Sequence, residues 1–192
     1  RYISGETQFY LGRRYVLKVI TDAKTNDVIN STVKLSRGKL HVELSQNDSE
    51  LDAEKRAILV KSLIDKWYKG KFTSVSRERL EALIHKASWV KDFLNMLHQK
   101  LLRKLIVMKK QWGSCSNKGN LILNPHLVKA PKECIDYVIL HELCHIAEHN
   151  HSEHFWRLLT QVMPHWKEVK ARLDGMAELY LNEWNLELGS LR

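Results

Sequence analysis

The chain has 192 residues, of which 44% are hydrophobic and 28% charged, and its net charge is +9. This composition predicts a globular protein of one domain, or one domain with a small subdomain, and excludes the disordered and fibrous classes. No apolar run approaches the roughly 20 residues of a membrane-spanning helix, so we expect no membrane partner.

The first fifty residues predict a small antiparallel β region. Residues 9–20 alternate apolar and polar side chains, as a half-buried strand does. The same period of two recurs at 33–35 and 40–44, which predicts a hairpin with Gly38 at a positive-φ position. We expect a packing role for this region. Because the chain begins with arginine, we also expect it to be truncated at its start.

Helical periodicity begins after residue 50. One helix is expected from 51 to 69 and to end at Gly70, because glycine commonly follows the last turn of a helix. Ser76 is a candidate cap for a further helical stretch that reaches Leu101. This stretch is long enough to contain a break, which the sequence does not place.

The basic excess is concentrated in the segment 61–118, which holds 14 Lys and Arg against 4 Asp and Glu. The rest of the chain holds 17 against 18. A concentrated basic patch indicates an anionic partner, and nucleic acid is the partner we consider. The alternative is a solvated helix face that carries lysines for solubility.

A hairpin and two helices are expected in the second half of the chain. Residues 105–109 and 121–124 read as strands on either side of a turn-rich loop at 111–120. Pro131 suits the first position of the next helix, where its missing N–H is not needed. Ser152 is the candidate cap of the helix after that.

Residues 141–145 read His-Glu-Leu-Cys-His, and five of the ten histidines lie between positions 141 and 154. Residues four apart share one helix face, so His141 and His145 can offer two imidazoles to one metal ion while Glu142 projects beside them. H-E-x-x-H on a helix is typical of zinc hydrolases. The alternative is a chance match in a His-rich surface segment. The context favours zinc, because the apolar residues of this helix fall on its opposite face.

A zinc hydrolase usually has three protein ligands and leaves the fourth position to water. His151 is the best third candidate, because the spacing H-E-x-x-H-x5-H returns the chain to the metal just after the helix. We expect the bend near Asn150, which tolerates the left-handed conformation, since residue 148 is glutamate rather than glycine. The competing ligands are the other nearby histidines and two carboxylates of the last helices: His149, His154, Glu168 and Glu178.

Glu142 is the candidate general base. It would take a proton from a zinc-bound water, whose pKa the metal lowers toward ~7, and pass it to the leaving group. Cys144 falls on the opposite face of the helix and reads as a small buried hydrophobe. Cys115 lies in the expected loop and is open to packing, reactive or substrate-contacting roles. The three cysteines have no framework spacing, which favours a reducing compartment, the cytoplasm.

Several landmarks together resemble one family, the YgjP-like metallopeptidases, related to the SprT-like and WLM zinc proteases. They run in the family's order through 104–173, and the early Gly12-Arg13-x-Tyr15 and Trp67-Tyr68 extend the match over most of the chain. The landmarks are Trp112 to Ser116, Gly119 to Asn124, Ala130-Pro131, Ile135 to Ile139, His141 to His145, Asn150 to Ser152, Phe155-Trp156 and Met163-Pro164.

The resemblance implies an α+β fold of the small zincin type, in which the H-E-x-x-H helix packs against a small antiparallel sheet. The β region at 1–50 would precede a zincin-like metallohydrolase domain at 51–192. The resemblance also implies His141, His145 and His151 as ligands of Zn²⁺ and Glu142 as the catalytic residue. The hairpin at 104–124 would form one edge of the cleft, where an extended peptide could pair by strand addition.

Two positions depart from the family's usual pattern: Gln111 stands where the family usually has arginine, and His165 where it often has a carboxylate. Neither is an expected ligand. The leading hypothesis is a zinc metallopeptidase acting on a peptide or protein. Alternatives are a zinc hydrolase of a non-peptide substrate such as a nucleotide, and a non-catalytic zinc-stabilised module that binds nucleic acid. The sequence does not indicate the oligomeric state.

Overall fold

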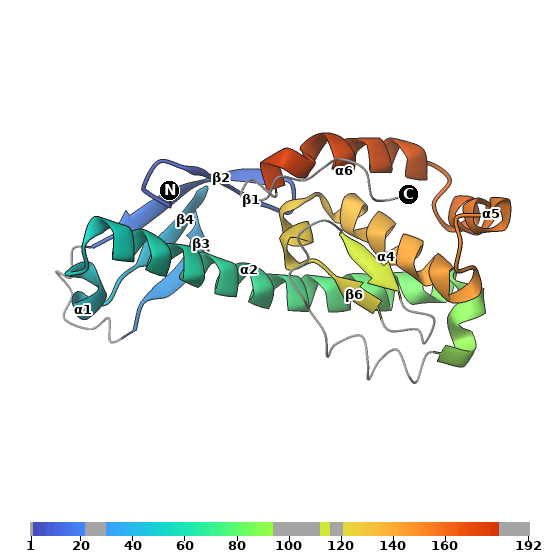
Figure 1. Cartoon of the computed structure of the whole chain (residues 1–192), viewed down its shortest axis with the longest axis horizontal. Helices are drawn as coiled ribbons and strands as arrows, with labels where there is room; N and C mark the ends of the chain where they lie inside the picture. Colours follow the sequence, from blue (N-terminus) through green and yellow to red (C-terminus); the bar gives the residue numbers. More distant parts are fainter. Residues whose placement is uncertain (1, 22–29, 94–111, 116–120, 181–192) are drawn as a thin grey trace. The chain divides into compact units, whose positions relative to one another are not determined.

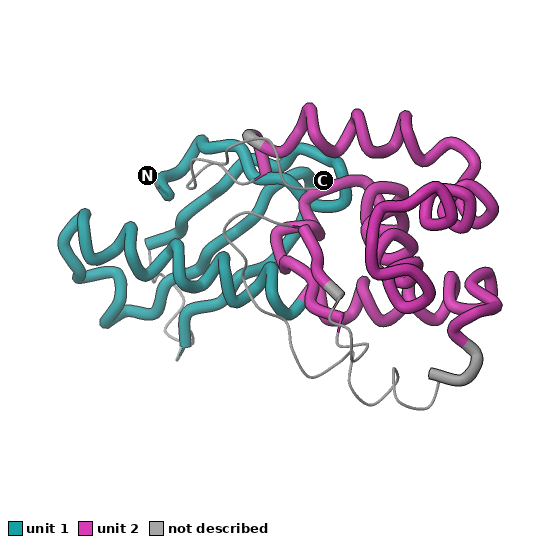
Figure 2. Tube along the Cα trace, turned by 45° about the vertical axis from the view of Figure 1, so that its right-hand side comes forward, with its two compact units in different colours: residues 1–70 teal, residues 71–192 magenta. Residues whose placement is uncertain are grey.

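The computed structural model describes residues 2–21, 30–93, 112–115 and 121–180. The chain divides into two compact units, Arg1–Gly70 and Lys71–Arg192 (Figure 2). The expected domain boundary at residue 50 stays a prediction, because the division at Gly70 separates compact units and falls within a helix. Within the described ranges, no helix is both long and apolar enough to cross a membrane.

A four-stranded sheet in the order β1-β2-β4-β3 forms the body of the first unit (Figure 1). β1 pairs with β2 and β3 pairs with β4 antiparallel, but β2 and β4 run parallel. The expectation of a wholly antiparallel region is therefore wrong at the central pairing. A period of two shows which side chains share a face and leaves the direction of the neighbouring strand open. The strands are β1 (Thr7–Tyr10), β2 (Arg13–Ile20), β3 (Thr32–Ser36) and β4 (Lys39–Glu43).

Both hairpins of this sheet turn through pairs of residues with positive φ. Arg37 and Gly38 join β3 to β4 with φ of 47° and 74°, so the predicted role of Gly38 is confirmed. Leu11 and Gly12 join β1 to β2 with φ of 48° and 78°. Two successive positive-φ residues are the geometry of the type I′ turn, whose twist matches that of the strands.

Helix α2 (Ala53–Leu83) follows a short helix α1 (Gln46–Ser49) and is continuous through Gly70. The expected end at Gly70 is wrong. A glycine inside a helix costs only about 1 kcal/mol relative to alanine, and burial of an uninterrupted apolar face exceeds that cost. Four buried side chains at helical spacing lie on both sides of Gly70: Ile64, Tyr68, Phe72 and Val75.

Ser76 is an interior residue of this helix rather than a cap, and its hydroxyl donates to the carbonyl of Thr73 at 3.3 Å. The break left unplaced by the sequence lies at Leu83, after which the chain continues as two 3₁₀ helices, η1 (Ile84–Lys86) and η2 (Ser88–Phe93).

Helix α4 (Lys132–Ala147) carries the H-E-x-x-H motif and is the central element of the second unit. It contacts α5 (Glu153–Val162) and α6 (Trp166–Tyr180), which Figure 1 labels, and also η2, η3 (Pro125–Lys129) and strand β5 (Gly113–Cys115). Pro131 is the residue just before its first turn, one position earlier than predicted. Ser152 caps α5 as predicted, since its hydroxyl accepts from the Phe155 N–H at 3.3 Å.

The sheet beside α4 is an antiparallel pair of β5 (Gly113–Cys115) and β6 (Leu121–Leu123). The predicted α+β class, with the motif helix packed against a small antiparallel sheet, is confirmed. The predicted pairing of this hairpin is nevertheless wrong, because the strand that pairs with β6 is β5, which lies in the segment predicted as a loop. The predicted strand at 105–109 lies outside the described residues.

Two polar contacts fix α4 against the elements that precede it in this unit. Arg79, near the end of α2, donates from Nε and Nη2 to the two carboxylate oxygens of Asp136 at 2.7 and 2.8 Å. The Trp89 indole N–H of η2 donates to the carbonyl of Leu143 at 3.0 Å. Because a two-bonded arginine–carboxylate pair fixes orientation as well as distance, α4 is held in one rotation about its axis.

Candidate metal centre

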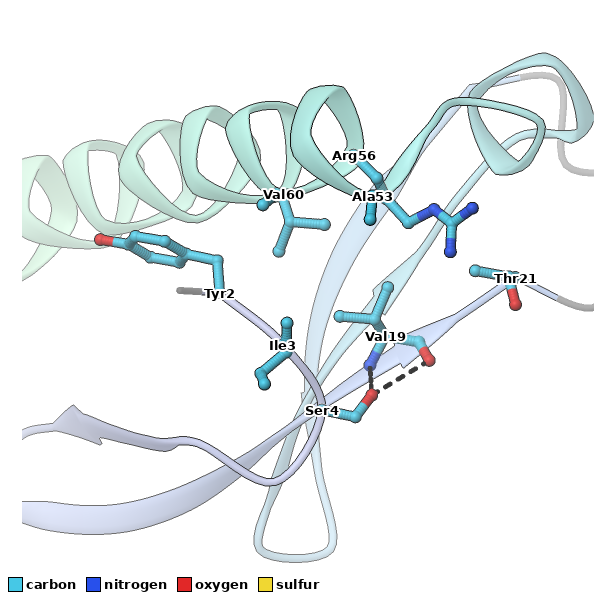
Figure 3. Close-up of a pocket in the computed structure, with 9 residues that line it drawn as sticks. Tyr2, Ile3, Ser4, Val19, Thr21, Ala53, Arg56 and Val60 are labelled. Atoms are coloured by element: carbon cyan, nitrogen blue, oxygen red, sulfur yellow. Dashed lines mark hydrogen bonds between the residues drawn. The ribbon is translucent and has the colours of Figure 1, made fainter.

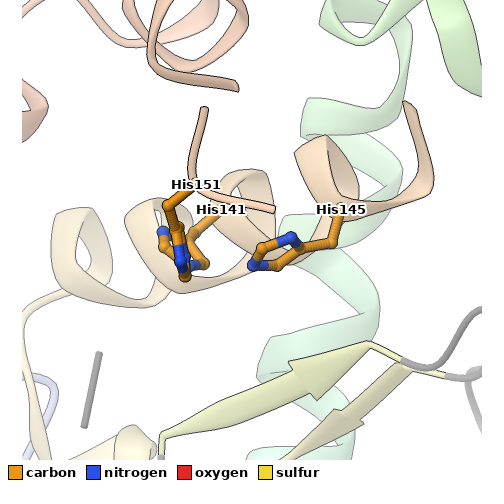
Figure 4. Close-up of side chains that lie close together, drawn as sticks. All are labelled: His141, His145 and His151. Carbon is orange, nitrogen blue, oxygen red and sulfur yellow. The ribbon is translucent and has the colours of Figure 1, made fainter. Parts of the chain in front are cut away.

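Three histidine side chains converge where α4 ends and the chain returns toward it (Figure 4). His141 and His145 rise from the last two turns of α4, and His151 comes from the segment before α5. One ring nitrogen from each can be chosen so that all lie within 4.8 Å of one another. The Nε2 atoms of His141 and His151 are 3.0 Å apart. Two nitrogens bound to tetrahedral zinc at 2.0–2.1 Å would lie about 3.3 Å apart, so the cluster fits one ion.

The remaining ring nitrogens of the pair on α4 face other protein groups. His145 Nδ1 lies 3.1 Å from the carbonyl oxygen of Glu148, to which it donates in the tautomer that leaves Nε2 free. His141 Nδ1 lies 3.5 Å from the Tyr137 hydroxyl. Metal-binding histidines usually donate their second nitrogen in this way, which fixes the tautomer and the ring orientation.

The bend that returns His151 to the site lies at His149 and Asn150, where it was expected. Helix α4 ends at Ala147, and Glu148 adopts an extended conformation with φ of −140° and ψ of 108°. Asn150 does not have a positive φ, so the prediction of a left-handed bend there is wrong. The Glu148 carbonyl lies 3.1 Å from His145 Nδ1, and the chain then bends without entering the left-handed region.

All three imidazoles are held neutral. Burial lowers the pKa of His141 to about 3, with smaller effects from the charges of His145, His151 and Lys170. Burial also lowers the pKa of His145 and of His151. A lowered pKa favours the neutral ring, and only the neutral ring offers a lone pair to a metal. The ligands are therefore ready at neutral pH without first losing protons.

Two aromatic side chains of α5 support the cluster, and neither had been assigned to the site from the sequence. The ring of Phe155, fully buried, lies 4.6–4.9 Å from all three imidazole centroids. Trp156 stacks on His151 at 5.4 Å with 21° between the planes. Close packing of this kind fixes ring positions and excludes water from one side of the cluster.

Glu142 is 2% exposed, and its Oε2 has no hydrogen-bond partner among the described residues. Burial raises the pKa of its carboxyl to about 8. A buried unpartnered carboxyl is costly, and a cation beside it would offset that cost by favouring the charged form. Glu142 follows His141 directly, so an ion held by the three histidines would supply that cation. The donor set and the orphaned oxygen both fit a divalent metal.

Gly113 of β5 allows the sheet to approach this carboxyl. A Cβ at position 113 would lie 2.8 Å from Glu142 Oε1, 3.0 Å from its Cγ and 3.1 Å from Val138 Cγ1. Real Cβ atoms are essentially never found at the first of these distances, so the buried carboxyl of Glu142 would have to shift. Glycine in a strand often marks such a close approach. The sequence reasoning had placed Gly113 in a loop, where this signal could not be used.

We expect Gly113→Ala to reduce kcat/KM roughly a hundredfold, because a shift of about 1 Å in a catalytic group can cost that much. Metal content should stay at the wild-type value, since the three atoms nearest to a Cβ at position 113 belong to Glu142 and Val138 and none belongs to a histidine. Gly175→Ala in α6 is the matched control, because its Cβ would meet nothing within 4 Å. A Gly113→Ala enzyme within threefold of wild type would show that Glu142 tolerates displacement.

Three of the competing ligand candidates, His149, His154 and Glu168, do not join the cluster. His149 and His154 are exposed, and His154 Nδ1 lies 3.4 Å from a carboxylate oxygen of Glu148. Glu168 is exposed on α6, and the side chain of Glu178 lies outside the described part of the chain. Cys144 is buried, as predicted, with burial raising its pKa to about 12. The side chain of Cys115 and the whole of Gln111 also lie outside the described residues.

A separate hollow of about 290 Å³ lies in the first unit, between the N-terminal segment, β2 and the start of α2 (Figure 3). Its one charged side chain, Arg56, donates from Nη2 to the carbonyls of Ser49 and Leu51 at 3.1 and 2.7 Å. The hydroxyl of Ser4 accepts from the Val19 N–H at 2.9 Å. These groups form hydrogen bonds to the backbone, so the described residues that line the hollow form no catalytic arrangement.

The family model described as "YgjP-like, metallopeptidase domain" matches residues 1–176. The chain belongs to the YgjP-like family. The resemblance inferred from the sequence landmarks is thereby confirmed, and the protein is a metal-dependent peptidase. The crystal structure of the metallopeptidase zymogen of Pyrococcus abyssi abylysin is similar at 27% identity, with a TM-score of 0.37, over 50% of this chain and 98% of that one. No curated protein matched the chain.

The structure explains His165, the second departure from the family's usual pattern, by its contact with Glu133. Its Nε2 lies 2.8 Å from Oε1 of Glu133, whose other oxygen accepts from Arg172 at 3.0 Å. A carboxylate at position 165 would instead face Glu133. The histidine thus joins the chain before α6 to the first turn of α4, away from the three clustered histidines.

Proposed function

We propose that this YgjP-like metallopeptidase holds one Zn²⁺ through His141, His145 and His151 and uses Glu142 as general base. One observation carries the proposal: three neutral imidazole nitrogens converge, and the residue that follows His141 carries a buried carboxyl oxygen with no partner among the described residues. Imidazole nitrogens suit zinc, and three protein ligands leave one position for water or substrate. A structural zinc site would be closed by a fourth protein ligand and would not need Glu142.

When bound, zinc lowers the pKa of water toward ~7 and polarises the substrate carbonyl. Glu142 then takes the proton of the attacking water on a carboxylate oxygen and returns it to the nitrogen of the leaving amine. Glu142 Oε2 has no hydrogen-bond partner among the described residues, so it is available to take that proton. Phe155 closes the rear of the cluster and keeps other water away.

The substrate we propose is a polypeptide in extended conformation. Strand β5 lies directly against Glu142 through Gly113, so a peptide added to the β5–β6 pair would run close to the candidate general base. Main-chain hydrogen bonds of strand addition bind peptides with little dependence on sequence. We place the protein in the cytoplasm, supported by its buried free thiols, Cys134 and Cys144.

The proposal predicts zinc-dependent cleavage of peptides. The protein, stripped with chelator and reloaded with zinc, is incubated with a mixed peptide library and with a set of nucleotides, and products are identified by mass spectrometry. We expect peptide cleavage that chelator removes and zinc restores. Hydrolysis of nucleotides alone would favour the non-peptide alternative, and activity that survives chelation would contradict a metal mechanism.

A nucleic-acid partner for segment 61–118 remains a prediction with a simple test. Two of its described cations are already paired: Lys61 with Asp65 at 2.8 Å and Arg79 with Asp136 at 2.7 Å. If the remaining cations contact phosphates, affinity for a DNA duplex should fall steeply between 50 and 200 mM salt, on the order of 10³-fold for six contacts. Binding that is absent, or flat with salt, would leave these lysines as solubility residues.

A further inference from the structure

A groove of about 750 Å³ lies between α5 and α6 in the second unit. This volume is within the range of small-ligand sites, roughly 300–1,000 Å³. Its floor is formed by two indole rings, Trp156 and Trp166, and its rim by polar and charged side chains. Neither the proposed chemistry nor the packing of α4 uses this groove.

The floor of the groove is rigid. The rings of Trp156 and Trp166 stack at 4.6 Å with 13° between their planes. The Trp166 N–H donates to the hydroxyl of Thr160 at 3.1 Å, and that hydroxyl donates to the carbonyl of Trp156 at 2.7 Å. The Trp166 indole is therefore tied to α5 by a hydrogen bond, and the Trp156 indole is held by stacking on it. A preorganised aromatic floor binds apolar groups with little loss of conformational entropy.

The rim carries two cations that have no ion-pair partner among the described residues, Arg157 and Lys167. Both are exposed, and Lys167 Nζ lies 5.7 Å from the centroid of the Trp166 ring. The single acid of the rim, Glu153, is the first residue of α5, where the helix dipole stabilises a negative charge. The groove thus combines an apolar floor with cations free to bind a carboxylate.

The groove adjoins the candidate metal centre through one shared side chain. Trp156 lines the groove and also stacks on His151 at 5.4 Å. A column of nearly parallel rings therefore runs from Trp166 through Trp156 to an imidazole of the histidine cluster. Trp156 therefore stands between the groove and the histidine cluster, so a segment held in the groove lies next to the candidate metal centre.

We propose that the α5–α6 groove binds a segment of the polypeptide substrate that combines acidic and large apolar side chains. Apolar side chains contact the part of the Trp156 indole that its two stacking partners leave exposed, and carboxylates pair with Arg157 and Lys167. The inference rests on the proposed peptidase function and names a substrate preference for it. Exposed ion pairs are individually weak, so the groove selects among peptides while the strand pairing supplies sequence-independent affinity.

The test measures binding rather than cleavage. Labelled hexapeptides of alternating Glu and Leu, Gln and Leu, or Lys and Leu are titrated by fluorescence anisotropy into the full-length Glu142→Gln chain, which should not turn them over. We expect the acidic peptide to bind about tenfold more tightly than the Gln peptide, with a preference that shrinks as salt rises. Arg157→Ala with Lys167→Ala should abolish that preference, and Lys86→Ala, an exposed cation of η1, should preserve it.

Three outcomes would overturn the groove assignment: equal binding of the three peptides, an acidic preference that survives the double variant, or a groove-dependent affinity for a dT12 oligonucleotide instead of the acidic peptide. Because both substituted side chains are exposed, the double variant should fold as wild type, which circular dichroism checks. If the acidic preference is absent while zinc-loaded wild type still cleaves peptides, only the groove proposal fails. If the preference is present without cleavage, the proposed function fails.

Discussion

Glu142→Gln should reduce peptide hydrolysis by at least about 10³-fold and leave zinc bound at one ion per chain. The amide has the size of the carboxyl but cannot accept the proton of the attacking water, and general-base catalysis contributes about 10²–10⁴-fold. Glu142 is not among the three clustered ligands, so metal content should not change. Steady-state kinetics and metal analysis on the same preparation measure both quantities.

Glu168→Gln is the matched control, because Glu168 is an exposed carboxylate on α6. It should keep both activity and zinc. Activity of Glu142→Gln within tenfold of wild type would rule out Glu142 as the general base. Loss of zinc from the variant would indicate that Glu142 is a metal ligand. That result would contradict the proposal that the three histidines are the only protein ligands.

The metal-free protein offers a second measurement on the same variant. Burial raises the pKa of Glu142 to about 8 from an ordinary value of 4.5, so the folded state favours the protonated carboxyl. The stabilising effect of protonation is present below pH 4.5 and is lost as pH rises toward 8. Between pH 4.5 and pH 8, the metal-free wild type should therefore lose more free energy of unfolding than metal-free Glu142→Gln, because the amide of the variant does not titrate. Urea unfolding at pH 5 and pH 8 measures the difference.

His151→Ala should lose most of its zinc, whereas His154→Ala should keep a full complement. His151 Nε2 lies 3.0 Å from His141 Nε2 inside the cluster, while His154 is exposed and faces Glu148. Removing one of three ligands leaves two imidazoles, which hold zinc far more weakly at neutral pH. Metal content after dialysis against a weak chelator measures the difference. Equal zinc in the two variants would contradict the assignment of His151.

The motif residues were predictable because helix geometry fixes them. A spacing of four places His141 and His145 on one face, and their nitrogens do converge in the structure. His151 followed from the length of chain needed to return to that face. What the sequence could not give is how α5 packs on α4, which places Phe155 beneath the three imidazoles. Tertiary packing of this kind has no local sequence signal.

The surroundings were predicted less well for two physical reasons. Gly70 was read as a helix end, because its local propensity is visible in the sequence while the buried face that continues past it is decided by packing. Gly113 was read as a loop residue, although its strand pairing with Leu123 brings it against Glu142. The burial of Glu142 was also missed. The amphipathic pattern placed this side of the helix away from the core, but the structure buries Glu142.

Anomalous diffraction at the zinc edge, from crystals of the full chain grown with zinc chloride, tests the central claim most directly. We predict one strong site bonded to Nε2 of His141, His145 and His151, with Glu142 nearby but unbonded and a fourth position held by water. An ion bound by His149 or His154, or a site closed by a fourth protein ligand, would contradict the proposed catalytic centre.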